Sequence, residues 1–229
     1  IRRRGSFANG RSDLPRLSRG SGSRRPSPAP SLARIIPFPE TSRENTDMGL
    51  DRVPSGKALP NDFNVIIEIP MHSDPVKYEV DKDSGAVFVD RFMSTAMHYP
   101  CNYGYIPHTI AGDGDPVDVL VVTQFALPPG VVVRCRPIGM LSMEDEAGPD
   151  AKLLAVPVDS LTSMYRDIES PRDFPQVILD QIAHFFAHYK DLERGKYVKV
   201  AGWLGSDEAK KEIMEGVQAY ANAKDKPAF

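Results

Sequence analysis

The stretch Asp113-Gly114-Asp115-Pro116-Val117-Asp118 runs directly into the apolar stretch Val119-Leu120-Val121-Val122. Three carboxylates therefore stand within six residues, at the mouth of a predicted buried strand. Carboxylates about 5 Å apart repel each other by roughly 3 kcal/mol at an effective dielectric constant of about 20. A chain tolerates such a cluster when a cation binds in it, and carboxylate oxygens suit Mg²⁺, Mn²⁺ or Ca²⁺.

Two other interpretations of this stretch compete with a metal site. Asp and Gly favour turns, so the run is also compatible with a solvated hairpin turn. An EF-hand calcium loop requires Gly at its sixth position and Glu at its twelfth, where this chain has Asp118 and Gln124. The EF-hand is therefore excluded, and the choice between a turn and a metal site depends on the rest of the chain.

Composition indicates one sizeable domain with an N-terminal appendage. The 229 residues are 41% hydrophobic, enough for a core, and no apolar run reaches the length of about 18 residues that a membrane span needs. Cys101 and Cys135 have neither metal-type nor redox-type spacing, which is typical of small buried residues in a reducing compartment. Residues 1–47 carry a net charge of +6, whereas residues 48–229 carry a net charge of −9.

The basic segment, residues 1–47, contains ten Arg, eight Ser and six Pro, with few large apolar residues. Such a segment cannot bury enough surface to offset its chain entropy, so we expect it to be disordered and separate from a domain over residues 48–229. Three interpretations compete: an organelle transit peptide, a nucleic-acid-binding tail, or a segment that does not belong to the native protein. The third is favoured, because the chain opens with Ile1 and Met48 stands where ordered sequence is expected to begin.

The pattern of apolar residues predicts a mainly β domain that ends in helices. The predicted strands span residues 63–69, 77–80, 86–89, 119–122, 131–138, 152–158 and 197–200. Residues 99–107 are Tyr- and Pro-rich and are predicted to form a loop. Apolar residues at three- and four-residue steps predict a helix over residues 176–193, and Ser206 is predicted to cap a second helix. Many short strands followed by two helices favour a small β-barrel with the helices packed outside it.

Further charged residues add to the first cluster. The acidic loop at residues 144–150 supplies Asp145, Glu146 and Asp150, which gives five aspartates at the ends of adjacent predicted strands. Five exceed the need of one divalent ion, so the pattern indicates a site with two or more metal ions. Cationic and phenolic side chains beside these segments suit a phosphate-rich anion, since each phosphate oxygen requires a cation or a donor. They are Lys77, Arg91, Lys152, Tyr189 and Lys190.

Each of these candidates also has an ordinary interpretation. A lysine on a strand usually lies on a solvated face, and Tyr189 belongs to the apolar stripe of the predicted helix. His184 and His188 have the i, i+4 spacing of metal ligands, but they lack the HExxH pattern. We therefore assign both histidines to the helix surface or core.

Taken together, these segments resemble the soluble family I inorganic pyrophosphatases of the compact bacterial type. The family signature Asp-x-Asp-Pro-x-Asp-x stands at residues 113–119. The resemblance runs from about Met48 to the C-terminus, with the motifs in the family's order and spacing, and it leaves out residues 1–47. The other matching motifs are Ile67-Glu68-Ile69-Pro70, Lys77-Tyr78-Glu79, Phe88-Val89-Asp90-Arg91, Tyr99-Pro100-Cys101-Asn102-Tyr103-Gly104-Tyr105, the segment from Asp145-Glu146 to Lys152, and His188-Tyr189-Lys190-Asp191.

The resemblance implies a five-stranded OB-like β-barrel flanked by two C-terminal helices. It implies a hydrolase that converts inorganic pyrophosphate to two orthophosphates by means of a metal-bridged hydroxide, with two or more Mg²⁺ per active site. It further implies assembly into a homohexamer and a cytoplasmic location, with organelle import only if residues 1–47 are a genuine transit peptide. Neither nucleic acid nor a membrane is an expected partner.

The resemblance also implies a part in the reaction for each matched position. Asp115 would be the general base for the attacking water. The Mg²⁺ ligands would be Asp113, Asp118, Asp145 and Asp150, with support from Glu68, and Asp118 would bridge two ions. The phosphate groups would be held by Lys77, Arg91, Tyr103, Lys152, Tyr189 and Lys190. Glu79, Tyr99 and Glu146 would orient these side chains.

Two other classes of function compete with this one. Barrels of this shape often bind single-stranded nucleic acid, but such a module predicts a basic groove, whereas residues 48–229 carry a net charge of −9. A calcium-binding structural domain would not need the Lys, Arg and Tyr set. Phosphate release from pyrophosphate with and without Mg²⁺ distinguishes the three classes.

Overall fold

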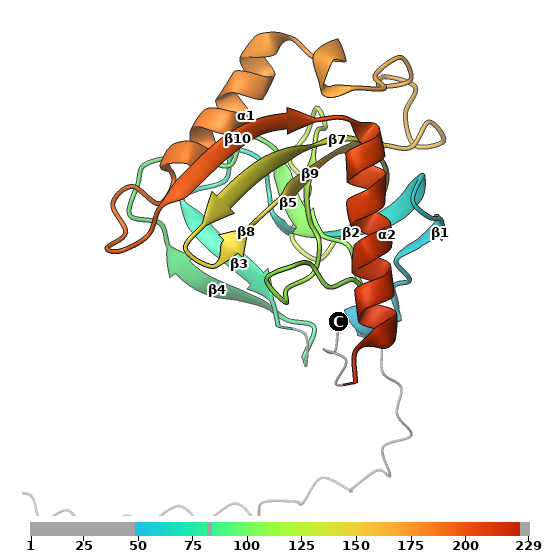
Figure 1. The fold of residues 1–229 in the computed structure, drawn as a ribbon, viewed down its shortest axis with the longest axis horizontal. Helices are drawn as coiled ribbons and strands as arrows, with labels where there is room; N and C mark the ends of the chain where they lie inside the picture. The colour runs from blue at the N-terminus through green and yellow to red at the C-terminus, as the bar shows by residue number, and fades with distance from the viewer. Residues whose placement is uncertain (1–48, 82–83, 225–229) are drawn as a thin grey trace, which may run out of the picture. The chain divides into compact units, whose positions relative to one another are not determined.

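The computed structural model describes residues 49–81 and 84–224, shown in Figure 1. The predictions about residues 1–47 lie outside the described residues. The strands are β1 (Gly56–Ala58), β2 (Asp62–Ile69), β3 (Val76–Val80), β4 (Val87–Phe92), β5 (Asn102–Tyr105), β6 (Asp118–Val121), β7 (Val132–Asp145), β8 (Gly148–Pro149), β9 (Lys152–Pro157) and β10 (Val198–Leu204). The helices are α1 (Gln176–His188) and α2 (Ser206–Asn222), with short 3₁₀ turns η1 (Leu50–Arg52) and η2 (Pro171–Asp173).

Five of the strands close into a ring in which each strand is hydrogen-bonded to two others. β2 pairs with β5, β5 with β6, β6 with β9, β9 with β7, and β7 returns to β2. The β6–β9 pair is parallel and the other four pairs are antiparallel. β10 extends the sheet beyond β7, while β3 and β4 form a separate two-stranded hairpin. The predicted fold class is therefore confirmed, as a five-stranded ring with two helices after it.

The strands of the ring are buried on both faces, which explains their nearly continuous apolar sequence. Successive side chains of a strand point to opposite faces. Leu120 and Leu154 accordingly pack in one cluster with the apolar side chains of α1, including Ile182. Their neighbours, such as Val119, pack in a second cluster with α2. In Figure 1, α1 lies along β10 and α2 lies beside β7, in agreement with these contacts.

The predicted loop at residues 99–107 is wrong in part, because it contains β5. Gly104 lies so close to β2 that a Cβ atom there would stand 2.0 Å from the carbonyl oxygen of Ile66. A glycine is therefore required for this strand pair, although glycine is depleted in strands and weakens the sequence signal. β7 likewise continues to Asp145, into the predicted acidic loop, because β10 pairs with its end through Val198.

The helix boundaries also differ from the prediction. α1 ends at His188 rather than at residue 193, because the chain continues in tight turns in which Glu193 N–H donates to Lys190 C=O at 2.8 Å. α2 begins with Ser206, so the capping residue is Gly205. The Glu208 carboxylate accepts the Gly205 N–H at 3.1 Å, which completes the helix start. In the described residues, no helix is both long and apolar enough to cross a lipid bilayer.

Candidate active site

A cavity of about 350 Å³ opens at one end of the ring, next to the β3–β4 hairpin and the end of α1. All fifteen residues that the sequence singled out line this cavity, although they come from seven separate segments of the chain. They are Glu68, Lys77, Glu79, Arg91, Tyr99, Tyr103, Asp113, Asp115, Asp118, Asp145, Glu146, Asp150, Lys152, Tyr189 and Lys190. The part that each would take in a reaction stays a prediction.

The carboxylate motif is a tight loop held by its own backbone. Ala111 N–H donates to Asp115 C=O at 2.7 Å, and Gly114 N–H donates to Ala111 C=O at 3.1 Å. Gly114 has a φ of +94°, which side-chain-bearing residues rarely adopt. Asp113 Oδ1 accepts the Asp115 N–H at 3.1 Å. The stretch is thus a turn, as one interpretation expected, but its carboxylates line a cavity.

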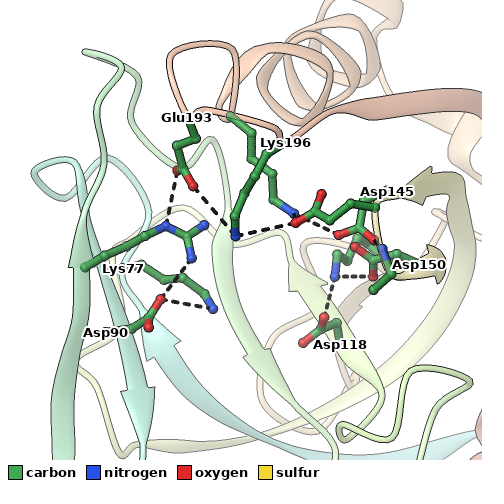
Figure 2. A network of polar contacts seen from close by, with 12 residues as sticks. Lys77, Asp90, Asp118, Asp145, Asp150, Glu193 and Lys196 are labelled. Carbon is green, nitrogen blue, oxygen red and sulfur yellow. Dashed lines mark hydrogen bonds and ion pairs between the residues drawn. The ribbon is translucent and has the colours of Figure 1, made fainter.

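Lys152 forms ion pairs with both Asp118 and Asp150; Figure 2 shows the two aspartates on the same side of the site. The lysine is 5% exposed, and its Nζ stands 2.5 Å from Asp150 Oδ1. Burial alone would lower the pKa of Lys152, but the charges of Asp118 and Asp150 outweigh it and hold the pKa above its usual range. Burial raises the pKa of Asp150, against the opposing effect of Lys152. The ammonium therefore stays charged and neutralises part of the negative charge on this side of the cavity, called the carboxylate wall below.

A second lysine holds the neighbouring acidic segment. Lys190 Nζ donates to Asp145 Oδ2 at 2.7 Å and stands 3.5 Å from Glu146 Oε1. Burial works to raise the pKa of Asp145, but the hydrogen bonds from Lys190 and from Ala147 N–H outweigh it and lower the pKa. Asp145 therefore remains ionised at neutral pH.

Glu68 is the carboxyl group whose ionisation the cavity opposes. It is 8% exposed on β2, and its Oε1 accepts the Val80 N–H at 2.8 Å. Burial raises the pKa of Glu68 from 4.5 to about 8, and the negative charge of Asp118 adds to this increase. A cation entering the cavity would relieve both effects.

A second group of cations, Arg91 and Lys77, lines the other side of the cavity, called the opposite wall below, and both form ion pairs with carboxylates. Arg91 Nη1 stands 3.0 Å from Asp90 Oδ2, and Arg91 Nε stands 3.2 Å from Glu193 Oε1. Lys77 forms ion pairs with Glu79 and, at 3.4 Å, with Asp90. The pKa of Lys77 is raised, because its contact with Glu79 outweighs burial, which works to lower it.

Lys196 links the two walls, and the sequence did not single it out. Its Nζ stands 3.4 Å from Glu146 Oε1 and 3.8 Å from Glu193 Oε2. In Figure 2, Lys196 and Glu193 form a continuous chain of ion pairs from the side of Asp90 to the side of Asp145. The sequence also missed Asp90 and Glu193 as partners of Arg91, although Asp90 lay inside a quoted motif. Charge beside a motif is the only sequence signal that either offers.

Three tyrosines, Tyr99, Tyr103 and Tyr189, line the cavity, and their phenol groups stay protonated. Tyr99 and Tyr103 have ring centroids 5.3 Å apart, and both are buried. Burial raises the pKa of both phenols well above the ordinary value. Burial likewise raises the pKa of Tyr189, although Lys190 opposes this. All three phenols therefore keep the proton that a phosphate oxygen would accept as a hydrogen bond.

The donor set fits a hard divalent cation. Within residues 49–81 and 84–224, no three His, Cys, Asp or Glu side chains are grouped in an arrangement ready to hold a metal ion. The ammonium of Lys152 stands between Asp118 and Asp150 and is the cation of this wall. The surrounding donors are carboxylate oxygens, which suit Mg²⁺, Mn²⁺ or Ca²⁺ better than softer metals. Burial is the main cause of the raised pKa of Glu68, and the negative charge of Asp118 adds to it.

The histidine pair on α1 lies elsewhere. His184 and His188 are exposed, with ring centroids 4.5 Å apart, and His188 Nδ1 stands 2.8 Å from Asp191 Oδ2. Of the two assignments that the sequence left open, helix surface or core, the structure shows the helix surface. Neither residue lines the cavity.

Comparison with known proteins identifies the family. The family model described as inorganic pyrophosphatase matches residues 65–221. The chain is 60% identical over 179 residues to the inorganic pyrophosphatase of Escherichia coli (strain K12), covering 78% of this chain and 100% of that protein. It is 59% identical over 173 residues to the inorganic pyrophosphatase of Xanthomonas campestris, covering 76% of this chain and 97% of that protein.

Solved structures agree with this result. A crystal structure of an inorganic phosphatase from Anaplasma phagocytophilum has a TM-score of 0.73 and 50% identity, covering 74% of this chain and 99% of that chain. The inorganic pyrophosphatase of Thermus thermophilus has a TM-score of 0.72 and 40% identity, covering 76% and 99%. Since the family model spans most of the chain and curated relatives reach 60% identity, the chain belongs to the inorganic pyrophosphatases and is a hydrolase.

Proposed function

We propose that this chain hydrolyses inorganic pyrophosphate to two orthophosphates and requires Mg²⁺, with two or more ions per active site. The observation that carries the proposal is the charge of the cavity, which is lined by eight carboxylates and five cationic side chains. Pyrophosphate is a polyanion, so a cavity with an excess of negative charge repels it unless further cations enter. The carboxylates are Glu68, Glu79, Asp113, Asp115, Asp118, Asp145, Glu146 and Asp150, and the cations are Lys77, Arg91, Lys152, Lys190 and Lys196.

The carboxylate wall would hold the ions. Asp113, Asp118, Asp145 and Asp150 are the proposed ligands, and Glu68 supports them from β2. When bound there, Mg²⁺ supplies positive charge to the phosphates and lowers the pKa of water. Lys152 lies on the same wall between Asp118 and Asp150. It would share their negative charge with the ions and also face the substrate.

Asp115 would act as the general base. It lies on the loop that β6 follows, and the backbone of that loop is fixed by its own hydrogen bonds. Asp115 accepts a proton from water as the water oxygen bonds to one phosphorus. The bond from that phosphorus to the bridging oxygen breaks, and the second phosphate leaves with the bonding electron pair. Lys and Arg side chains on the opposite wall stabilise the charge that develops on it.

The proposal extends to assembly and location. The resemblance implies a homohexamer, and several large apolar side chains are exposed on the described part of the chain, among them Phe88, Phe92 and Phe125. Such side chains supply contacts between subunits. Sedimentation of the purified protein measures the assembly, and fractionation of cells measures the proposed cytoplasmic location.

The test is phosphate release from pyrophosphate by the full chain. Activity should require Mg²⁺ and vanish with EDTA, and Ca²⁺ should inhibit, because its longer and looser bonds misplace the reacting groups. Asp118→Asn should lower both Mg²⁺ affinity and turnover. Asp115→Asn should lower turnover by about 10²- to 10⁴-fold and flatten its rise with pH, since the base is lost.

A matched control is Asp207→Asn, at an exposed position on α2 whose side chain is 94% accessible, and it should leave turnover unchanged. Full activity in metal-free buffer would contradict the proposed metal dependence. Turnover near the wild-type value for both cavity variants at saturating Mg²⁺ would show that the assigned site is wrong.

A further inference from the structure

Helix α2 contacts the carboxylate loop at Gly216, which is buried. The Ile110 N–H of the loop donates to the Gly216 C=O of the helix at 3.0 Å. A Cβ atom at position 216 would stand 2.6 Å from Val117 Cγ2 and 3.3 Å from Thr109 Cβ. Real Cβ atoms essentially never approach another heavy atom to 2.6 Å, so any larger residue at position 216 would displace Val117. The helix and the loop are therefore in direct contact through a residue without a side chain.

Thr109 closes the base of the same loop. It is fully buried, and its Oγ1 donates to Ile106 C=O at 2.6 Å and accepts the Val117 N–H at 3.0 Å. Ile106 N–H in turn donates to Val117 C=O at 3.0 Å. The two hydrogen bonds that involve Val117 thus tie the end of the loop to its start, and the third fixes the Thr109 hydroxyl within the start. The hydroxyl accepts the Val117 N–H, so a residue of the same shape without it would leave a buried N–H unsatisfied.

Val117 connects these contacts to the carboxylates. It is 1% exposed and packs in one cluster with Ala209 and Ile213 of α2. It immediately precedes Asp118 and follows Asp115 by two residues. Because protein interiors are close-packed, Val117 can make room for a new methyl group only by moving, and the backbone moves with it. A displacement of Val117 by α2 is therefore transmitted to Asp115 and Asp118.

We propose that Gly216 and Thr109 are positioning residues that fix Asp115 and Asp118 relative to the rest of the cavity. The inference rests on the proposed function, in which these carboxylates serve Mg²⁺ and water. Neither Gly216 nor Thr109 lines the cavity, so each acts only through the loop. Glycine is a poorer helix former than alanine, and its presence inside α2 is explained by the close approach of the loop.

The test measures Mg²⁺ binding to the full chain by isothermal titration calorimetry without pyrophosphate, so that the readout does not depend on activity. Gly216→Ala should weaken Mg²⁺ binding about tenfold or more. Adding Val117→Ala should restore much of that loss, because it removes the methyl groups that the new Cβ atom meets. Thr109→Val should also weaken binding, whereas Thr109→Ser should keep it, because serine retains both hydrogen bonds.

The matched control is Gly205→Ala, at the start of the same helix. Its added Cβ atom would meet only Glu208 Oε2, at 3.3 Å, which is the end of a flexible side chain. This variant perturbs α2 without touching the loop, and its Mg²⁺ affinity should equal that of the wild type. Thermal unfolding in EDTA, measured for every variant, separates lost stability from lost positioning.

Wild-type Mg²⁺ affinity in both Gly216→Ala and Thr109→Val would overturn the inference, even if both variants melted at lower temperature. If Gly216→Ala does not fold, the Thr109 pair decides: equal affinities for Thr109→Val and Thr109→Ser overturn the inference. A wild-type chain that neither binds Mg²⁺ nor hydrolyses pyrophosphate would instead contradict the proposed function. The two failures are therefore distinguishable.

Discussion

Replacing Glu68 by Gln tests how much the ionised carboxylate of Glu68 lowers the free energy of unfolding of the metal-free protein. Glu68 is 8% exposed, and burial together with the charge of Asp118 raises its pKa from 4.5 to about 8. One pKa unit corresponds to about 1.4 kcal/mol. The ionised carboxylate therefore costs the folded, metal-free protein about 5 kcal/mol relative to the unfolded chain.

The sign of the pH dependence follows from this shift. Between pH 4.5 and about 8 the folded state binds more protons at Glu68 than the unfolded state does. This group therefore lowers the free energy of unfolding as pH rises through that window. Gln has nearly the same shape and can accept the Val80 N–H, but it carries no charge. Glu68→Gln should match the wild type near pH 4.5 and be more stable by about 5 kcal/mol at about pH 9.

The assay is urea unfolding of EDTA-treated protein at about pH 5, 7 and 9, at matched protein concentration, followed by the fluorescence of Trp203. Glu215→Gln, an exposed position on α2, is the matched control and should follow the wild type. Mg²⁺ should stabilise the wild type more than Glu68→Gln, because the carboxylate then has a cation beside it. Parallel pH profiles for the wild type and Glu68→Gln in EDTA would refute the reasoning.

Two further predictions concern the cation wall and the N-terminus. Glu193→Gln should raise the KM for pyrophosphate about tenfold with a smaller change in kcat. The reason is that Arg91 and Lys196 lose the carboxylate that holds both cations in place. Initial rates measure this, and an unchanged KM would contradict it. A chain beginning at Met48 should fold, assemble and hydrolyse pyrophosphate like the full chain, because all fifteen site residues lie at or after Glu68. Gel filtration and phosphate release test this, and lost activity would contradict it.

The sequence predicted the elements whose signal is local. β6 and β9 contain continuous apolar runs and β2 a nearly continuous one, all buried on both faces, and such runs mark strands without knowledge of their partners. β5 was not predicted, because its tyrosines and Gly104 form a strand only through pairing with β2, which is far away in sequence. Strand pairing between distant segments is a tertiary effect, and it overrides local propensity.

The candidate site was predicted to a similar extent. Its residues were found because carboxylates clustered around a turn are costly without a cation, and because the surrounding motifs matched a family. Glu193 and Lys196 carry no such signal, since they follow a helix as ordinary charged residues. Glu193 acquires its place only by contacting Arg91, 102 residues earlier in the chain. The sequence likewise gives no signal at Gly216, because its role depends on how closely Val117 approaches it in the fold.

The register of the ring ties the charges of the cavity to the packing of the core. Asp118 is the first residue of β6 and Lys152 the first of β9, and the residues that follow each of them are buried. Because parallel pairing sets Val119 opposite Leu153, it also brings Asp118 beside Lys152 at the same end of the ring. A slip of one residue would exchange the side chains that pack against α1 with those that pack against α2, and the close packing of both clusters opposes this. The apolar core therefore resists the movement that would separate Asp118 from Lys152.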